Sequence, residues 1–159
     1  MELNTRGRYA VMAMADLAKS ALDQPSVPLS AIAERQQISL AYLEQLFVKL
    51  RRAQLVESER GRSGGYRLAR VASDISVADI LLAVEEKTDM TRCGQEAGEP
   101  CIAGKRCLTH GLWDALSAHI DTFLTGVTLD QVIDGSLRKA KGPVLETAPA
   151  LFNGGIWPR

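Results

Sequence analysis

Three cysteines and a histidine gather in one glycine-rich stretch, residues 91–110, of this 159-residue chain. The stretch holds every cysteine of the chain, spaced Cys-x7-Cys-x5-Cys-x2-His through Cys93, Cys101, Cys107 and His110. Thiolates grouped with an imidazole are typical of a site for a soft metal. A disulfide framework is not expected, because three cysteines cannot all pair within one chain and the N-terminal residues lack the apolar region of a secretory signal.

Two kinds of metal centre suit four such donors, a tetrahedral zinc ion and an iron–sulfur cluster. Structural zinc sites usually place paired cysteines about two to four residues apart. Here the first two gaps are long and rich in glycine and proline. The spacing therefore favours a cluster over zinc, with zinc and unrelated buried cysteines as the alternatives. An enzyme with Cys107 as nucleophile and His110 as base is not expected, because no oxyanion-hole motif, phosphate loop or orienting acid accompanies the pair.

A long helix predicted over residues 108–126 would carry Cys107 and His110 at its first turn. Its apolar face is unusually broad and consists of Leu112, Leu116, Ile120 and Phe123, flanked by Leu108, Trp113 and Leu124. A chain this small has little interior left to cover that face, so we expect a partner helix in a homodimer rather than a buried core. Capping boxes at Ser76/Asp79 and Thr128/Gln131 predict a helix ending near Glu86 and a short helix after residue 128.

The front half of the chain reads as a winged helix-turn-helix. Thr5 is the expected cap of a first helix, and helices are predicted over residues 29–36 and, after the N-cap Ser39, over 40–53. The last of these has an apolar stripe of Leu40, Leu43, Phe47 and Leu50, with Leu46 beside it. Two strand-like runs, 55–58 and 66–69, are joined by the glycine-rich segment 59–65, which predicts a hairpin wing. The predicted fold is mainly α with a small β-hairpin wing and a long dimerisation helix.

Charge is distributed unevenly along a chain whose formal net charge is zero. Residues 1–70 carry 11 Lys/Arg against 7 Asp/Glu, whereas residues 71–159 carry 8 against 12. Residues 49–70 alone hold 7 basic against 2 acidic side chains. A basic stretch in an otherwise acidic chain indicates a nucleic-acid footprint. An electron-transfer protein or cluster carrier would not need this basic wing.

The first turns of the helix at 40–53 would place Ser39, Ala41, Tyr42, Glu44 and Gln45 toward base edges in the major groove. Gln45 suits adenine, whereas Glu44 suits cytosine or rejects sites that offer no donor. Farther along, Arg51 and Arg52 suit phosphates. Arg60 and Arg62 on the wing suit the minor groove, and Gly61 lets the backbone approach closely. The alternatives are surface packing by Tyr42 and an ion pair between Glu44 and Lys49.

Four stretches, "RYAVMAMADLA", "ISLAYLEQLFVKLRRAQLV", "RGRSGGYRLAR" and "TRC…C…CLTHGLW", closely resemble the IscR-type iron–sulfur cluster regulators, a family of small bacterial winged-helix transcription factors. The resemblance covers about residues 1–133, and its most specific part is the cysteine stretch. It implies a homodimer on double-stranded promoter DNA, with a 2Fe–2S cluster in each subunit held by Cys93, Cys101, Cys107 and His110. It also implies control of cluster-assembly and iron-related genes, with cluster-assembly proteins as donors. By the same resemblance, DNA contacts fall to Ser39, Tyr42, Gln45 and Arg51, and discrimination between operator classes falls to Glu44.

The chain departs from that family at three places. Ala41 stands where a serine is frequent, and the wing carries an additional arginine. The first cysteine gap is longer than usual and is similar to relatives that sense iron or nitric oxide with 4Fe–4S clusters. Those relatives lack the Cys-x-x-His, which favours the 2Fe–2S reading.

The expected organisation has three parts: a DNA-binding domain at 1–72, a cluster-binding loop with dimerisation helices at 73–133, and a disordered tail at 134–159. No window approaches about 18 uncharged apolar residues, so no membrane span is expected. We expect a cytoplasmic location.

Overall fold

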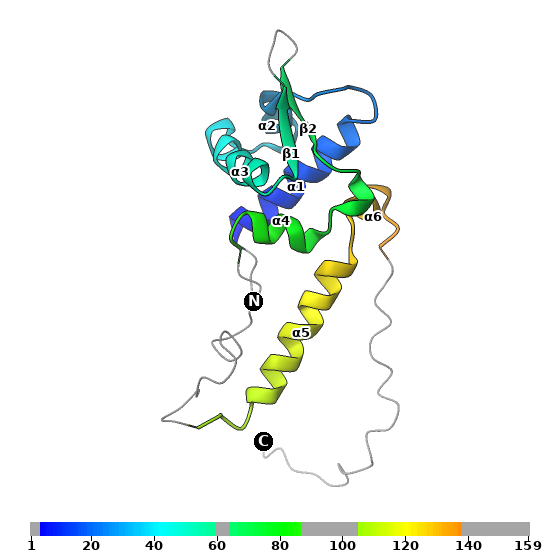
Figure 1. The fold of residues 1–159 in the computed structure, drawn as a ribbon. Coiled ribbons are helices and arrows are strands. Elements are labelled where there is room, and N and C mark those ends of the chain that lie inside the picture. Colours follow the sequence, from blue (N-terminus) through cyan, green and yellow to red (C-terminus); the bar gives the residue numbers. More distant parts are fainter. Residues whose placement is uncertain (1–3, 60–63, 87–104, 138–159) are drawn as a thin grey trace, which may run out of the picture.

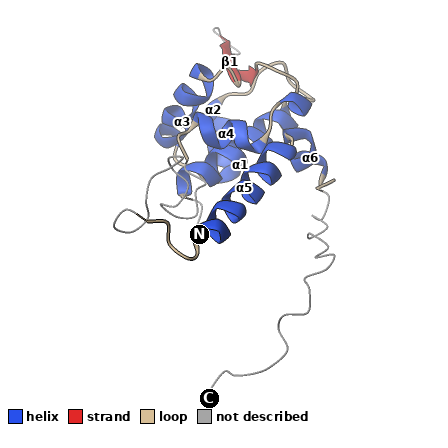
Figure 2. Cartoon of the chain, turned by 60° about the horizontal axis from the view of Figure 1, so that its bottom comes forward, coloured by secondary structure: helices blue, strands red, loops and turns tan. Residues whose placement is uncertain are grey.

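The structure is a computed structural model that describes residues 4–59, 64–86 and 105–137. It is mainly helical, with one two-stranded antiparallel hairpin among the described residues, as predicted (Figures 1 and 2). The elements are α1 (Thr5–Ser20), α2 (Leu29–Gln36), α3 (Leu40–Arg52), β1 (Val56–Glu59), β2 (Gly65–Leu68), a 3-10 turn (Ala72–Asp74), α4 (Val77–Ala83), α5 (His110–Gly126) and α6 (Leu129–Asp134). Residues 60–63, 87–104 and 138–159 lie outside this description. They include Arg60, Gly61 and Arg62 of the predicted wing, Cys93 and Cys101, and most of the predicted tail.

Helix α1 is the central element, and α2, α3, α4, α6 and β2 all pack against it. Its inner face is built from small and flexible side chains, with Ala10, Ala13 and Met14 fully buried. Small residues let several helices approach one axis closely, and the larger Phe47 of α3 is fully buried in the same core, with its ring against that of Tyr66. Thr5 is the first helical residue rather than the cap, a position that Asn4 takes. The predicted division into parts at residues 72 and 133 stays a prediction.

Three helices end in the same way without a glycine. Residues Gln37, Gln54 and Glu85 have φ of 52°, 57° and 57° and follow α2, α3 and α4. In each case the next residue, Ile38, Leu55 or Glu86, donates its N–H to a carbonyl of the last helical turn, Ala33, Leu50 or Leu81. This is the Schellman arrangement, whose left-handed position usually holds glycine because a Cβ there costs about 1–2 kcal/mol. The motif ends α4 at Ala83, so the prediction that this helix continues to about Glu86 is wrong.

The hairpin forms one residue away from the predicted strands, pairing Val56 with Leu68 and Glu59 with Gly65. Val27, in the loop before α2, forms an isolated antiparallel β-bridge with Tyr66 on β2, through two backbone hydrogen bonds of 2.8 Å. Gly65 lies so close to this loop that a Cβ would be 2.6 Å from the carbonyl carbon and oxygen of Val27. Gly65 pairs with Glu59 at the end of the hairpin next to the 60–63 connection, so β2 requires glycine at this point, and the two strands pack on α1 and α3.

Both predicted capping boxes are present, Ser76 with Asp79 before α4 and Thr128 with Gln131 before α6. Their two N-caps also pair as an isolated antiparallel bridge, and Val77 donates to the carbonyl of Val127 at 2.9 Å. The starts of α4 and α6 are consequently held side by side against α1.

Helix α5 packs on α4 and otherwise extends away from the helical core (Figure 1). None of its residues is buried, although its sequence is strongly apolar. Leu112 and Phe123 are 60% and 43% exposed. The alternative that this face lies in the core of the chain is wrong for the described residues. No helix among the described residues has the length and apolar character needed to cross a membrane.

Candidate nucleic-acid interface and cysteine site

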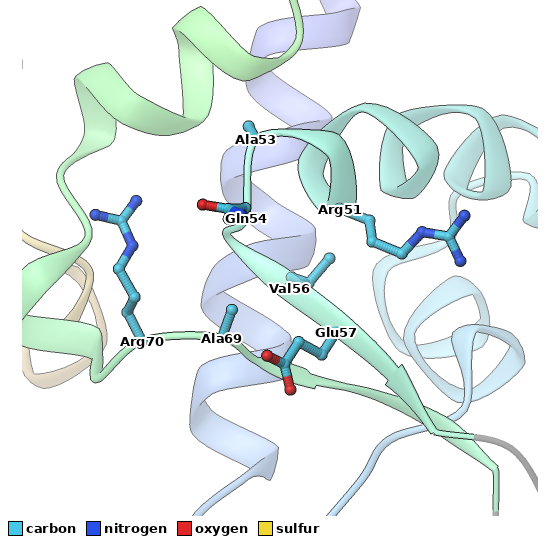
Figure 3. A pocket seen from close by; sticks show the side chains of 7 residues that line it. All are labelled: Arg51, Ala53, Gln54, Val56, Glu57, Ala69 and Arg70. Carbon is cyan, nitrogen blue, oxygen red and sulfur yellow. The ribbon is translucent and has the colours of Figure 1, made fainter.

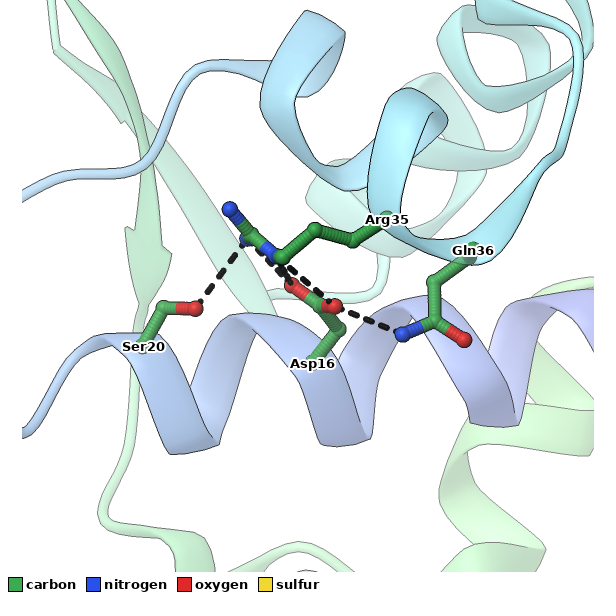
Figure 4. Close-up of polar contacts among 4 residues, drawn as sticks. All are labelled: Asp16, Ser20, Arg35 and Gln36. Atoms are coloured by element: carbon green, nitrogen blue, oxygen red, sulfur yellow. Dashed lines mark hydrogen bonds and ion pairs between the residues drawn. The ribbon is translucent and has the colours of Figure 1, made fainter.

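The first helix of the helix-turn-helix is fixed to α1 by a polar cluster around Asp16 (Figure 4). Arg35 donates through Nε at 3.1 Å to the Asp16 carboxylate, and Gln36 donates through Nε2 at 2.6 Å. The Asp16 side chain is only 6% exposed. Burial alone would raise its pKa, but the hydrogen bonds from Arg35 and Gln36 prevail and hold the pKa below its ordinary value. This cluster orients α2, and through the short turn at residues 37–39 it orients α3.

Helix α3 presents one face to the core and the opposite face to solvent. Leu43, Leu46, Phe47 and Leu50 are buried, as the apolar stripe predicted. Leu40 does not belong to that stripe, since it is exposed at the start of the helix. The outer face carries Ala41, Glu44, Gln45, Val48 and Arg52, which are all exposed and follow helical spacing. The structure thus brings Glu44 and Gln45 together on a continuous open surface.

Ser39 and Tyr42 flank the start of that surface. Ser39 is the exposed N-cap of α3, yet its side chain makes no capping hydrogen bond, so the hydroxyl can be directed to another group. Tyr42 is half-buried, and its ring meets that of Tyr9 edge-to-face with centroids 6.0 Å apart. The ring of Tyr42 is packed, and a tyrosine packed by its ring can still present its hydroxyl at the surface.

Two arginines, Arg51 and Arg70, border the start of the hairpin. Arg51 donates through Nη1 to the hydroxyl of Ser58 at 3.4 Å, which holds it beside β1. Together with Arg70 it lines an open pocket of about 490 Å³ at the start of β1, and the two guanidinium groups lie on opposite sides of the strand (Figure 3). Arg70, the last residue of the stretch "RGRSGGYRLAR", was not among the predicted site residues.

The two described strands of the hairpin carry no excess positive charge. Arg67 of β2 pairs with Glu57 at 2.6 Å and with Glu59 at 3.1 Å across the strands. Any excess positive charge of this wing therefore comes from residues 60–63, the segment that carries Arg60 and Arg62.

Lys49 pairs with Glu85 beyond the end of α4, with Nζ and Oε2 2.6 Å apart. The alternative that Lys49 pairs with Glu44 on the same helix is wrong. Glu44 consequently remains on the open face of α3. The hydrogen bond and charge of Lys49 hold the pKa of the Glu85 carboxyl below its ordinary value.

Cys107 and His110 lie on one turn at the start of α5, which begins at His110 rather than at residue 108. The His110 N–H donates to the Cys107 carbonyl at 3.1 Å, and both residues are half-buried. The Thr109 hydroxyl lies 3.6 Å from Cys107 Sγ and accepts a 3.2 Å hydrogen bond from the Trp113 indole. His119, which was expected to be surface or packing, is exposed on α5.

No group of three or more His, Cys, Asp or Glu side chains arranged for a metal occurs among the described residues. Cys93 and Cys101 are not among them, so the four-residue site stays a prediction of which the structure describes the Cys107–His110 half.

Comparison with known proteins agrees with this architecture. The family model described as Rrf2, iron-dependent transcriptional regulator, matches residues 3–135. A Neisseria meningitidis protein named as an HTH-type transcriptional regulator is 54% identical over 134 residues, covering 84% of this chain and 88% of the relative. The HTH-type transcriptional regulator IscR of Vibrio atlanticus is 53% identical over 133 residues, covering 84% and 75%.

Solved structures lead to the same group. T. potens IscR superposes with a TM-score of 0.70 at 35% identity, over 86% of this chain and 88% of that one. CymR, the global cysteine regulator of B. subtilis, also gives 0.70, at 30% identity, over 85% and 98%. These relatives are transcriptional regulators with a DNA-binding winged helix, and not enzymes. The chain belongs to the Rrf2 family of iron-dependent transcriptional regulators.

Proposed function

We propose that this chain is an IscR-type regulator that binds promoter DNA as a homodimer and responds to an iron–sulfur cluster in each subunit. The observation that carries the proposal is the Cys107–His110 turn, which begins the same helix, α5, whose apolar face is left open beside a winged helix-turn-helix. The relatives named IscR support the proposal, because their similarity covers both the winged helix-turn-helix and α5.

The donors present suit a 2Fe–2S cluster. Cys107 and His110 lie on the same turn and are both half-buried. The hydroxyl of Thr109 lies 3.6 Å from the sulfur of Cys107. Cys93 and Cys101 supply the two further thiolates in this proposal. When bound, the cluster supplies a redox-active centre whose presence depends on iron, sulfide and oxidants. A 4Fe–4S cluster and a zinc ion are the alternatives for the same residues.

His110 contributes a neutral ligand where a fourth cysteine would contribute an anion. A neutral imidazole raises the reduction potential of a cluster and can be lost to protonation, which makes the site labile. Lability suits a sensor that must lose its cluster when iron is scarce. Cluster-assembly proteins are the proposed donors, and cluster-assembly and iron-related genes are the proposed targets.

The proposed DNA contacts come from α3 and from the wing. The open face of α3 contacts bases in the major groove through Ser39, Tyr42, Glu44 and Gln45. Arg51 addresses a phosphate, whereas Arg60 and Arg62, with Gly61 between them, address the minor groove. A two-fold dimer of such units would bind a pseudo-palindromic site with half-sites about one helical turn apart.

The test is anaerobic purification followed by visible absorption and by iron, sulfide and zinc analysis. The proposal predicts a coloured protein with two irons and two acid-labile sulfides per subunit; four irons would indicate the 4Fe–4S alternative, and a colourless zinc protein would indicate the other.

A second test measures operator binding of the loaded and cluster-free protein, with Cys93→Ala and His110→Cys as variants. If neither variant changes binding to any operator, cluster sensing is excluded.

A further inference from the structure

The end of α4 differs from the two other helix ends that share its geometry. After α2 and α3, the residue following the left-handed position is a buried aliphatic, Ile38 or Leu55. After α4 this place is taken by Glu86, which is only 7% exposed. A hydrophobic side chain at this position is the usual companion of the motif. The chain therefore buries a carboxylate where its own two other examples bury an apolar group.

The Glu86 carboxylate is only half satisfied. Oε1 accepts the backbone N–H of Asn4, at the start of α1, at 3.0 Å, while Oε2 is buried and has no hydrogen-bond partner in the described structure. Gly7 accommodates this side chain, because a Cβ there would be 2.8 Å from Glu86 Cγ and 2.9 Å from Leu81 Cδ2. A buried carboxylate oxygen without a partner is destabilising, so packing alone does not explain Glu86.

The preceding residue, Glu85, is unusual for a second reason. It holds the left-handed position, which favours glycine, with φ of 57°. Its carboxylate contacts Lys49 of α3 at 2.6 Å and approaches Arg6 of α1 at 4.0 Å. Arg6 also donates to the carbonyl of Val84 at 3.3 Å. A glycine would relieve the backbone but would remove the side chain that reaches α3.

We infer that Glu85 and Glu86 are positioning residues that couple the cysteine-bearing segment after α4 to the recognition helix α3. Glu86 holds the exit of α4 on the N-terminus of α1, and Glu85 relates that exit to α3 through Lys49. The inference rests on the proposed function, because it concerns how cluster binding alters DNA binding.

The covalent order of the chain makes the junction suitable for this role. Glu86 precedes Cys93, the first cysteine of the chain, by seven residues. In this inference, a change in the cysteine-bearing segment on cluster binding is transmitted to Glu86 and Glu85, which tie the end of α4 to α1 and to α3. Lys49 lies one turn after Gln45, so a shift of Lys49 alters the presentation of the outer face of α3.

The experiment measures the dissociation constant for one operator duplex with loaded and with cluster-free protein, and takes the ratio of the two. Wild type is compared with Glu85→Gln, Lys49→Gln and the double variant. Removing either charge affects DNA attraction in both states alike, so the ratio isolates coupling. We expect each single variant to bring the ratio closer to one by about two- to fivefold, and the double variant to match the single ones.

Two further variants separate backbone strain from side-chain contact. Glu85→Gly removes the strain and the carboxylate together, and we expect the same loss of coupling as for Glu85→Gln. Glu86→Met restores an apolar group, and we expect a protein that is at least as stable to heat as wild type but has a reduced ratio. Asp23→Asn, which removes an exposed charge in the loop after α1, should leave the ratio unchanged.

A readout without the cluster completes the test. In cluster-free protein, Glu85→Gln should speed amide hydrogen exchange over residues 44–52, because α3 loses the ion pair between Lys49 and Glu85. If wild type itself shows no difference between loaded and cluster-free protein, the proposed function fails. If wild type shows the difference and the Glu85 and Glu86 variants keep it in full with unchanged exchange, the inference is overturned and the proposed function stands.

Discussion

The indole of Trp113 donates a 3.2 Å hydrogen bond to the hydroxyl of Thr109, and the same hydroxyl lies 3.6 Å from the sulfur of Cys107. One side chain thus separates an intrinsic fluorophore from a proposed cluster ligand. The chain has two tryptophans in all, and the second, Trp157, lies in the C-terminal segment outside the described residues.

This relationship predicts a direct optical signal for loading. In a Trp157→Phe background, reconstitution with iron and sulfide should strongly quench the Trp113 emission and shorten its lifetime, because a coloured centre forms beside Thr109. The measurement is time-resolved fluorescence during anaerobic reconstitution. The same protein with Cys107→Ala in addition should show a much smaller change. Equal quenching in the two proteins would place the coloured centre away from Cys107.

Gln45 and Arg51 should weaken DNA binding in different ways. Gln45→Ala removes a base contact, so it should cost about 1–3 kcal/mol on the preferred operator and relax specificity at one base pair. Arg51→Ala removes a phosphate contact, so it should weaken all sequences alike and reduce the salt slope by about one. Fluorescence anisotropy with operator and scrambled duplexes over a range of salt concentrations distinguishes the two. A uniform loss for Gln45→Ala would argue against base recognition by that residue.

The open apolar face of α5 predicts that a single charge disrupts the dimer. Phe123→Glu places a carboxylate on a side chain that is 43% exposed in the single chain and would be covered in a dimer. Sedimentation equilibrium should show the mass of one chain for this variant and of two for wild type. Leu22→Glu, at an exposed leucine outside α5, is the control and should remain dimeric. A dimeric Phe123→Glu protein would exclude this face as the interface.

Gly65 should tolerate no side chain. A Cβ would be 2.6 Å from the Val27 backbone, so Gly65→Ala must separate the hairpin from that loop and break the two 2.8 Å hydrogen bonds between Val27 and Tyr66. We expect a loss of about 2–3 kcal/mol in the free energy of unfolding. Gly126→Ala in α5 meets nothing within 4 Å and should be neutral or stabilise by up to about 1 kcal/mol. Urea unfolding of both variants checks the contrast, and similar stabilities would contradict it.

The Asp16 cluster predicts a specific dependence of stability on pH. Because the pKa of Asp16 is lower in the folded chain than in the unfolded one, its contribution is complete above the unfolded value of about 3.9 and disappears as pH falls through the folded pKa. Asp16→Asn should therefore be less stable than wild type from pH 7 down to about pH 4, with the gap narrowing at lower pH. Chemical unfolding over that range measures the gap. A gap that grows on acidification would have the wrong sign for a depressed pKa.

Local patterns were sufficient to predict the elements that carry the site. The helix at 29–36, the N-cap at Ser39 and both capping boxes follow from side chains within a few residues of each other, and the structure confirms them. The broad apolar face of α5 was also predicted from its periodicity, and none of the residues of α5 is buried in the described structure. The role of that face in a dimer remains a proposal.

What the sequence did not reveal depends on long-range contacts and on unusual residue choices. The left-handed positions are held by Gln37, Gln54 and Glu85 rather than by glycine, so the end of α4 was placed too late. Lys49 and Glu85 are 36 residues apart, and no local signal links them. The alternative pairing of Glu44 with Lys49 considered only a partner on the same helix, whereas Lys49 pairs with the distant Glu85.

The glutamines that follow α2 and α3 have a practical consequence for anyone who wishes to use the protein as a robust biosensor. Each sits in a backbone conformation that disfavours a side chain, and neither carboxamide serves as an anchor in the described structure. Glycine at both positions should stabilise the fold without changing the outer face of α3. The same substitution at Glu85 would remove its ion pair with Lys49.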